Sequence, residues 1–139
     1  MYASTAAICV AIDKLILFSD SQENPLLIDA QSELITARNI LENRWNIWNS
    51  IFWNGSNAAT KRSIRAKLEG LAFDALTGVI NAGELLNQYS DRFGILDENA
   101  PLWSETIGCL HNAYRWISET YYYDCFHKQL KLPVVLEST

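Results

Sequence analysis

The sequence predicts an all-α fold: an antiparallel bundle of four main helices with an irregular C-terminal tail, forming one domain over residues 1–139. Two observations predict it. Apolar residues recur in steps of three and four through four long segments, and this spacing places them on one face of a helix. The connections between the segments are short, as expected between antiparallel neighbours in a bundle.

The first expected helix covers roughly residues 5–18. Its only charged residues are Asp13 and Lys14, so it is apolar nearly all round, and we expect the other helices to cover it. A polar connection follows over residues 19–24. Asn24-Pro25 then indicates the start of a second helix, because asparagine caps free backbone amides and proline suits the first helical position.

The second expected helix runs to about Trp53 and ends at Asn54-Gly55. Its residues 34–53 contain three of the five tryptophans and form the stretch around which we expect the chain to be organised. One face carries Leu34, Ala37, Leu41, Trp45, Trp48 and Phe52. Ile40, Ile47 and Ile51 form an adjoining strip. An apolar arc this wide predicts contact with two neighbouring helices at once.

The third expected helix begins near Ser56 or Asn57 and has the most regular apolar spacing. Its stripe consists of Ile64, Leu68, Leu71, Ala75, Val79, Ala82, Leu86, Tyr89 and Phe93. Gly70, Gly78 and Gly83 lower helix propensity by about 1 kcal/mol each relative to alanine. Small residues at these positions would let a neighbouring helix come close, or would allow a kink.

Residues 94–100 form an expected loop, and Pro101 opens a fourth helix. The stripe of this helix consists of Trp103, Ile107, Leu110, Tyr114, Ile117 and Tyr121. Beyond Tyr123 the periodicity fades. Residues 130–136, LKLPVVL, are an apolar tail that we expect to pack along the bundle rather than to form a strand, because Pro133 interrupts it.

Composition excludes several classes of protein. A formal net charge of −5 and a pI of about 4.9 argue against a general nucleic-acid binder, which needs a basic face to neutralise phosphates. The apolar run over residues 6–18 is too short and too interrupted to span a bilayer, so we expect no membrane association. Three widely spaced cysteines without a CxxC pair predict a reducing, cytoplasmic location.

The residues required by common catalytic sites are missing. Only two histidines occur, His111 and His127, and neither has the spacing of a zinc or carboxylate-bridged metal site. Glycine-rich phosphate-binding loops are absent, so we expect no metal and no cofactor. Cys125 is close to His127 in sequence, but residues two apart on a helix point in different directions. The strip His111, Arg115 and Glu119 is best interpreted as a solvated helix face.

Two groups of charged residues are candidates for binding. Lys61, Arg62 and Arg65 open the third helix on the side away from its apolar stripe. They could bind an acidic partner or a phosphate group, although a simple balance to the acidic remainder is the favoured interpretation. Arg44 projects within the apolar arc of the second helix. We expect it at the edge of the core, with its stem on Trp48 and its head in water; the alternative is an Arg–Trp binding patch.

Surplus hydrophobic residues provide the strongest indication of a partner. Several lie off the main stripes of the third and fourth helices, and together with Arg44 they form a candidate partner-binding set. These residues are Phe73, Leu76, Ile80, Trp116, Tyr122 and Tyr123. A small bundle has limited core, so some should reach the surface, where aromatic patches mark interfaces. The alternative is that the first helix or the tail covers them.

These observations predict a small, acidic, non-enzymatic module that binds another protein and blocks or scaffolds it, as inhibitors and toxin-immunity proteins do. A second copy of this chain is an alternative partner, which would give a homodimer. The other function class is an enzyme or ligand-binding bundle. Its pocket would be lined by Trp45, Trp48, Trp103 and Tyr114, and its polar groups would come from Arg44, His111 or Arg115.

Overall fold

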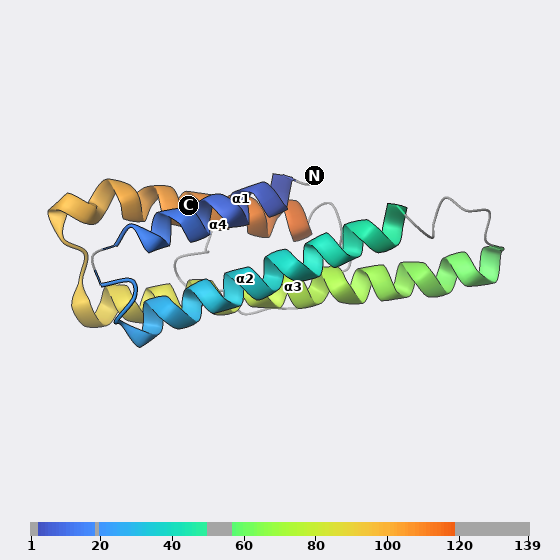
Figure 1. Cartoon of the computed structure of the whole chain (residues 1–139), viewed down its shortest axis with the longest axis horizontal. Helices are drawn as coiled ribbons and strands as arrows, with labels where there is room; N and C mark the ends of the chain where they lie inside the picture. The colour runs from blue at the N-terminus through green and yellow to red at the C-terminus, as the bar shows by residue number, and fades with distance from the viewer. Residues whose placement is uncertain (1–2, 19, 50–56, 119–139) are drawn as a thin grey trace.

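The computed structural model of the chain describes residues 3–18, 20–49 and 57–118, and every regular element in these ranges is helical. The elements are α1 (Ala3–Ile16), α2 (Pro25–Ile47), α3 (Ala58–Phe93), the short 3-10 helix η2 (Asp97–Asn99) and α4 (Ala100–Trp116). Each main helix runs opposite to the one before it, so the arrangement is an antiparallel bundle (Figure 1). The predicted all-α class is confirmed.

The four helices form two pairs. The long helices α2 and α3 pack along each other, while α1 packs on α4 and covers one side of the longer pair (Figure 1). Helix α2 contacts both α3 and α1, which confirms that its wide apolar arc meets two neighbours. At 1.5 Å per residue, the 36-residue α3 is about 54 Å long, whereas the 17-residue α4 is about 26 Å long.

Local sequence explains where the helices begin. The Asn24 side chain accepts a hydrogen bond from the amide of Leu26 at 3.0 Å, and Pro25 follows at the first helical position. The Asn57 side chain caps α3 by accepting from the amide of Thr60 at 2.8 Å. Both predicted helix starts are thus confirmed, whereas the predicted end of the second helix at Asn54-Gly55 lies outside the described residues.

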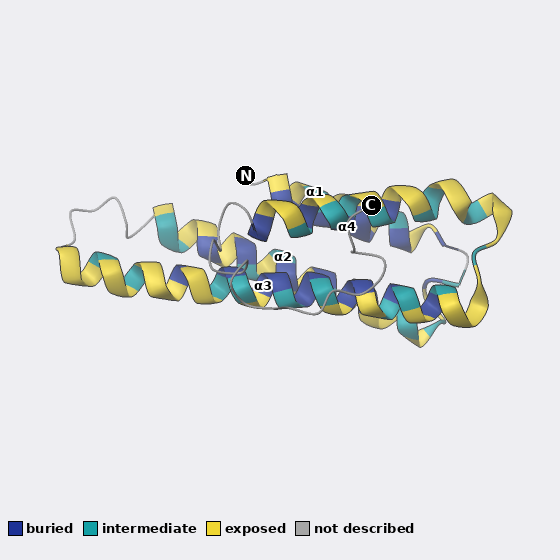
Figure 2. Ribbon diagram, turned by 180° about the vertical axis from the view of Figure 1, so that it is seen from behind, coloured by how far each residue is buried: buried dark blue, intermediate teal, exposed yellow. Residues whose placement is uncertain are grey.

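The core lies between the two pairs and follows the predicted stripes of the long helices (Figure 2). On α2 the fully buried positions are Leu27, Ala30, Leu34, Ala37 and Leu41. On α3 they include Ala72, Ala75, Val79, Ala82 and Leu86. Helix α1 departs from its prediction: only one face is buried, and Val10, Ile16 and Leu17 are exposed. Because α1 packs mainly on α2 and α4 among the described helices, its outer face is left exposed.

Helices α2 and α3 approach each other closely at Gly78. A Cβ atom at this position would lie 3.1 Å from the Cβ atom of Ala37 and 3.2 Å from the carbonyl oxygen of Glu33. Both neighbours belong to α2, so the absence of a side chain lets the two backbones approach. The expected role of small residues in α3 is confirmed here, and α3 continues through this position as one helix.

No helix in the described ranges combines the length and the apolar character that crossing a bilayer requires.

The loop from α3 to α4 begins at Gly94, whose φ of +70° is readily available only to glycine. This residue turns the chain so that α4 returns alongside α1.

We predict that Gly78→Ala destabilises the protein by about 1–2 kcal/mol, because the new methyl group must push against the α2 backbone. This figure is the net effect: the steric cost of the added methyl group, about 2–3 kcal/mol, exceeds the gain of about 1 kcal/mol in helix propensity. Gly70→Ala is the matched control: it lies in the same helix with no atom within 4 Å of the new Cβ, and should stabilise. Urea unfolding of both variants measures the difference. Equal effects would contradict a close contact at Gly78.

Candidate functional site

The end of the α2–α3 pair projects beyond α1 and α4 (Figure 1). We call residues 41–49 and 57–70 the hairpin tip. It projects because α2 and α3 are longer than the helices that cover them, so the length mismatch alone creates a two-helix protrusion.

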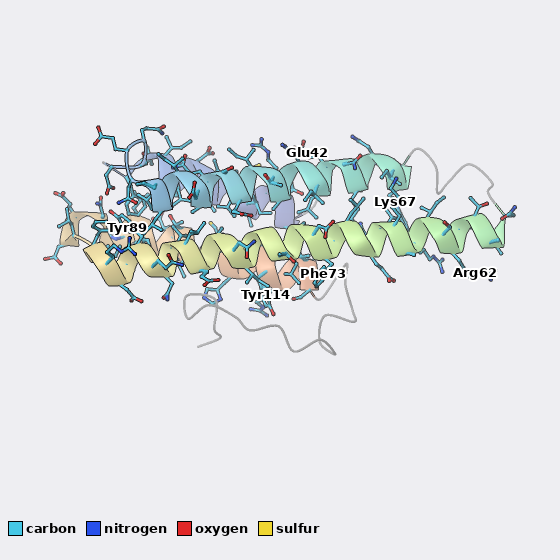
Figure 3. All side chains as sticks on the ribbon, turned by 90° about the horizontal axis from the view of Figure 1, so that it is seen from below. Glu42, Arg62, Lys67, Phe73, Tyr89 and Tyr114 are labelled. Atoms are coloured by element: carbon cyan, nitrogen blue, oxygen red, sulfur yellow. The ribbon has the colours of Figure 1, made fainter. Side chains whose placement is uncertain are left out.

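Four basic residues lie along the α3 side of the hairpin tip. Arg62, Arg65 and Lys67 are exposed, and Lys61 is half-buried. Figure 3 shows Arg62 and Lys67 on the part of α3 that lies beyond α4. By helical geometry Lys61, Arg62 and Arg65 share one side, while Lys67 lies on another. Like charges one turn apart repel each other, and positive charge is unfavourable near a helix N-terminus, so this arrangement costs stability.

The charges of the described chain are separated along its length. The hairpin tip carries five basic residues and two acidic ones, Glu42 and Glu69. The remaining described residues carry four basic and eleven acidic residues. The predicted basic cluster therefore lies apart from most carboxylates of the described residues. The hairpin tip is a positive projection on a negative body.

Arg44 is buried, with only 8 % of its surface exposed, so the predicted edge position with its head in water is wrong. Its Nε donates a hydrogen bond to the carbonyl oxygen of Leu68 at 3.2 Å, which ties α2 to α3 at the base of the hairpin tip. Arg44 continues the buried stripe one step beyond Leu41, and a carbonyl acceptor offsets the cost of burying its guanidinium. It is a structural link and does not belong to an exposed docking patch.

Trp45 takes the surface position that was expected for Arg44. It is 38 % exposed, although the sequence predicts it on the core face, and Trp48 is half-buried. Because α1 and α4 end before this part of α2, α3 is the only described helix left to cover it, and the buried arc becomes narrower. The hairpin tip therefore carries a partly exposed tryptophan on α2 and basic side chains on α3.

The rest of the predicted partner-binding set does not form one exposed patch. Leu76 is fully buried, which corrects its assignment, because central α3 contacts both α2 and α4 and so buries a wider arc. Phe73 and Ile80 are half-buried against the core. Trp116 is 49 % exposed at the end of α4. Tyr122 and Tyr123 lie outside the described residues.

The predicted tryptophan-lined pocket does not assemble. Trp103 lies at the turn end of the bundle, with its ring centroid 6.0 Å from that of Phe18 and 6.2 Å from that of Tyr89. Trp45 and Trp48 lie at the other end, on the hairpin tip. Tyr114 packs against the core late in α4, about three turns beyond Trp103. Residues at opposite ends of a bundle cannot line one pocket.

A different hollow opens at the turn end, which the sequence analysis missed. Its volume is about 240 Å³, and its walls come from the α1–α2 connection, the end of α3 and the α3–α4 loop. It is lined by Phe18, Asp20, Tyr89, Phe93, Gly94, Ile95, Leu96 and Asn99. The Tyr89 hydroxyl donates to the Asp20 carboxylate, with both oxygens at 3.1 Å. No sequence spacing links residues 20 and 89, so only the fold could reveal this site.

Two pKa shifts bear on chemistry in the described region. Burial, followed by the neighbouring Asp20 carboxylate, raises the pKa of Tyr89, so its hydroxyl stays a neutral donor. Burial also raises the pKa of the Cys109 thiol, which makes this cysteine a poorer nucleophile at neutral pH.

No group of three or more potential metal ligands gathers within residues 3–18, 20–49 and 57–118. The Cys125–His127 pair lies outside these ranges.

Comparison with known proteins identifies no relative: no protein-family model, curated protein or solved structure matches the chain. The functional argument therefore rests on the hairpin tip and on the hollow at the turn end.

We predict that Arg44→Met lowers the free energy of unfolding by about 1–3 kcal/mol, because it removes the buried bond to Leu68 while keeping an apolar stem. Arg38→Met is the control on the same helix. Arg38 bonds only weakly to its neighbour Asn39, at 3.4 Å, and its replacement should change stability by less than about 0.5 kcal/mol. Urea unfolding distinguishes the two, and a similar small effect at both positions would contradict a structural link through Arg44.

We predict that Tyr89 makes folding sensitive to alkaline pH. Its pKa in the folded protein lies above the ordinary value of 10.0, so its stabilising effect is present below pH 10.0 and disappears as the pH rises through the folded pKa. Between about pH 8 and about pH 11 the wild type should lose more stability than Tyr89→Phe, which cannot ionise there. Urea unfolding at both pH values tests this. Other groups titrate in both proteins and cancel, so equal losses would refute the prediction.

Proposed function

We propose that this protein is a binding module whose hairpin tip docks on an acidic surface of a partner protein. The observation that carries the proposal is the charge distribution among the described residues: the projecting tip has five basic residues, four of them on α3, and two acidic ones, whereas the rest of the described chain has four basic and eleven acidic residues. An acidic partner would relieve the repulsion among Lys61, Arg62 and Arg65. Electrostatic attraction would also orient the tip toward the partner during encounter.

The composition of the hairpin tip supports a protein partner rather than a nucleic acid. The tip carries Trp45 and the half-buried Trp48 as well as arginine and lysine, and tryptophan and arginine are enriched at the energetic centres of protein interfaces. A polyanion would extend past the small tip and meet a body that carries eleven carboxylates. Phosphate chains favour a continuous basic face, which the described chain does not present.

A rigid two-helix projection is also suited to obstructing what it binds. The tip is held by the packing of α2 on α3 and by the Arg44–Leu68 hydrogen bond, so little ordering cost is added on docking. A partner with an acidic groove would be occupied by the tip, while the body prevents access by other molecules. This is the mode of action that the proposal assigns to the protein, as an inhibitor or immunity-type module.

We predict that the triple variant Lys61→Glu, Arg62→Glu, Arg65→Glu loses at least about tenfold in affinity for the partner, equivalent to about 1.4 kcal/mol. Affinity capture from extracts of the native host, quantified by mass spectrometry, compares it with the wild type. Arg62→Glu and Arg92→Glu are a matched pair: both residues are exposed on α3, but at opposite ends. Only Arg62→Glu should weaken capture, and added salt should weaken the wild type.

Three outcomes would contradict the proposal. The first is that the triple variant captures the same proteins in the same amounts as the wild type. The second is that the wild type binds a single-stranded RNA homopolymer and loses this binding in the triple variant, so that phosphate occupies the tip. The third is a dimer in light scattering that the triple variant abolishes, because the tip would then bind a second copy of this chain.

A further inference from the structure

We propose that the hollow at the turn end is a binding site for a small organic cation, an ammonium group that carries methyl or short alkyl substituents. The site lies at the opposite end of the bundle from the hairpin tip and stands independently of the proposed function. The observation that carries it is the pairing of aromatic walls with one carboxylate, Asp20, in a hollow of about 240 Å³.

The walls provide the chemistry that alkylated ammonium ions require. Phe18, Tyr89 and Phe93 line the hollow together with the aliphatic Ile95 and Leu96. The negative π faces of aromatic rings attract a cation, and its alkyl groups pack on rings and aliphatic carbon. A strongly hydrated inorganic ion would have no comparable contacts on these walls.

Asp20 provides the charge. The Tyr89 hydroxyl donates its proton to the carboxylate, and both carboxylate oxygens lie 3.1 Å from the hydroxyl oxygen. Because the hydroxyl is neutral, this hydrogen bond does not cancel the negative charge of Asp20. No lysine or arginine lines the hollow, and none of those in the described ranges forms an ion pair with Asp20. A cation in the hollow would be the missing counter-charge.

The surroundings favour a cation as well. Asp97 and Glu98 lie in η2, which is part of the α3–α4 loop that borders the hollow. Glu23 lies with Asp20 in the connection between α1 and α2. Together they give this end a negative potential, which raises the local concentration of cations. Among the residues described at this end, the basic ones are Arg92 and Lys14, and Lys14 is already paired with Glu105 on α4. Neither of them lines the hollow.

The hollow is formed before any ligand binds. The Asp20 carbonyl accepts from the amides of Glu23 and Asn24 at 3.1 and 2.9 Å, which fixes the α1–α2 connection. On the opposite wall the ring centroids of Tyr89 and Phe93 lie 5.3 Å apart, and Trp103 supports Tyr89 from the core side. Figure 3 shows Tyr89 near the end of α3, where these segments meet. A preformed site loses little affinity to ordering.

Size limits the ligand. At about 30 Å³ for each water molecule in the liquid, the hollow has room for about eight waters. A ligand of similar volume has on the order of ten non-hydrogen atoms at most. Choline and tetramethylammonium meet this limit. A divalent metal does not suit the site, because one carboxylate among aromatic rings cannot provide the several oxygen ligands that such an ion takes.

The test titrates choline chloride into the full chain and follows backbone amide shifts by NMR, with 3,3-dimethylbutan-1-ol as a neutral molecule of the same shape and sodium chloride as the salt control. We expect choline to shift the amides around Gly94 and Asp20 and to bind at least about tenfold more tightly than the alcohol. The proposal would be overturned if choline and the alcohol bound with the same affinity, or if choline caused no saturable shift of these amides.

Variants locate the site. Asp20→Asn keeps an acceptor for Tyr89 while removing the charge, and should weaken choline binding at least about tenfold. Phe93→Ala removes a wall that is 55 % exposed and thus outside the core, and should weaken it severalfold. Asp97→Asn is the matched control, an acidic residue of the same end that does not line the hollow; it removes only part of the surrounding potential and should weaken choline binding less than about twofold. Equal weakening in Asp20→Asn and Asp97→Asn would show general charge attraction and refute a built site.

Discussion

The close packing of α2 on α3 is the constraint on which the rest of the structure depends. The two backbones meet at Gly78, where the neighbouring Ala37 and the Glu33 carbonyl leave no room for a side chain. Small residues along this contact let the helices pack over a long distance. The resulting pair carries the core on one side and extends beyond the ends of α1 and α4, the other two main helices that the structure describes.

This mismatch in helix length gives the molecule two different ends. At one end the hairpin tip exposes basic side chains and Trp45. At the other end the connections between helices meet, and short-range hydrogen bonds order them around Asp20 and Tyr89. Helix interiors contribute mainly to the core, whereas the ends bring together residues from distant parts of the chain. Both proposed binding sites therefore lie at ends of the bundle.

The errors of the sequence analysis have a common cause. Periodicity assumes that each helix has the same neighbours along its whole length, but α2 has two along its first part and only α3 at the hairpin tip. Trp45 therefore leaves the core, while Arg44 enters it and finds the Leu68 carbonyl. In the middle of α3 the opposite holds, because α4 adds a second neighbour and Leu76 becomes fully buried.

The sequence by itself determined the all-α class, the helix starts at Asn24 and Asn57, most of the buried stripes and the presence of a basic cluster on α3. These depend on local spacing, capping and charge, which act within a few residues along the chain. Only the tertiary structure decided that this cluster projects as a tip, that Arg44 is buried and that Asp20 meets Tyr89 across 69 positions. Such contacts depend on relative helix lengths and on which helices face each other, and these follow from the packing of the whole chain.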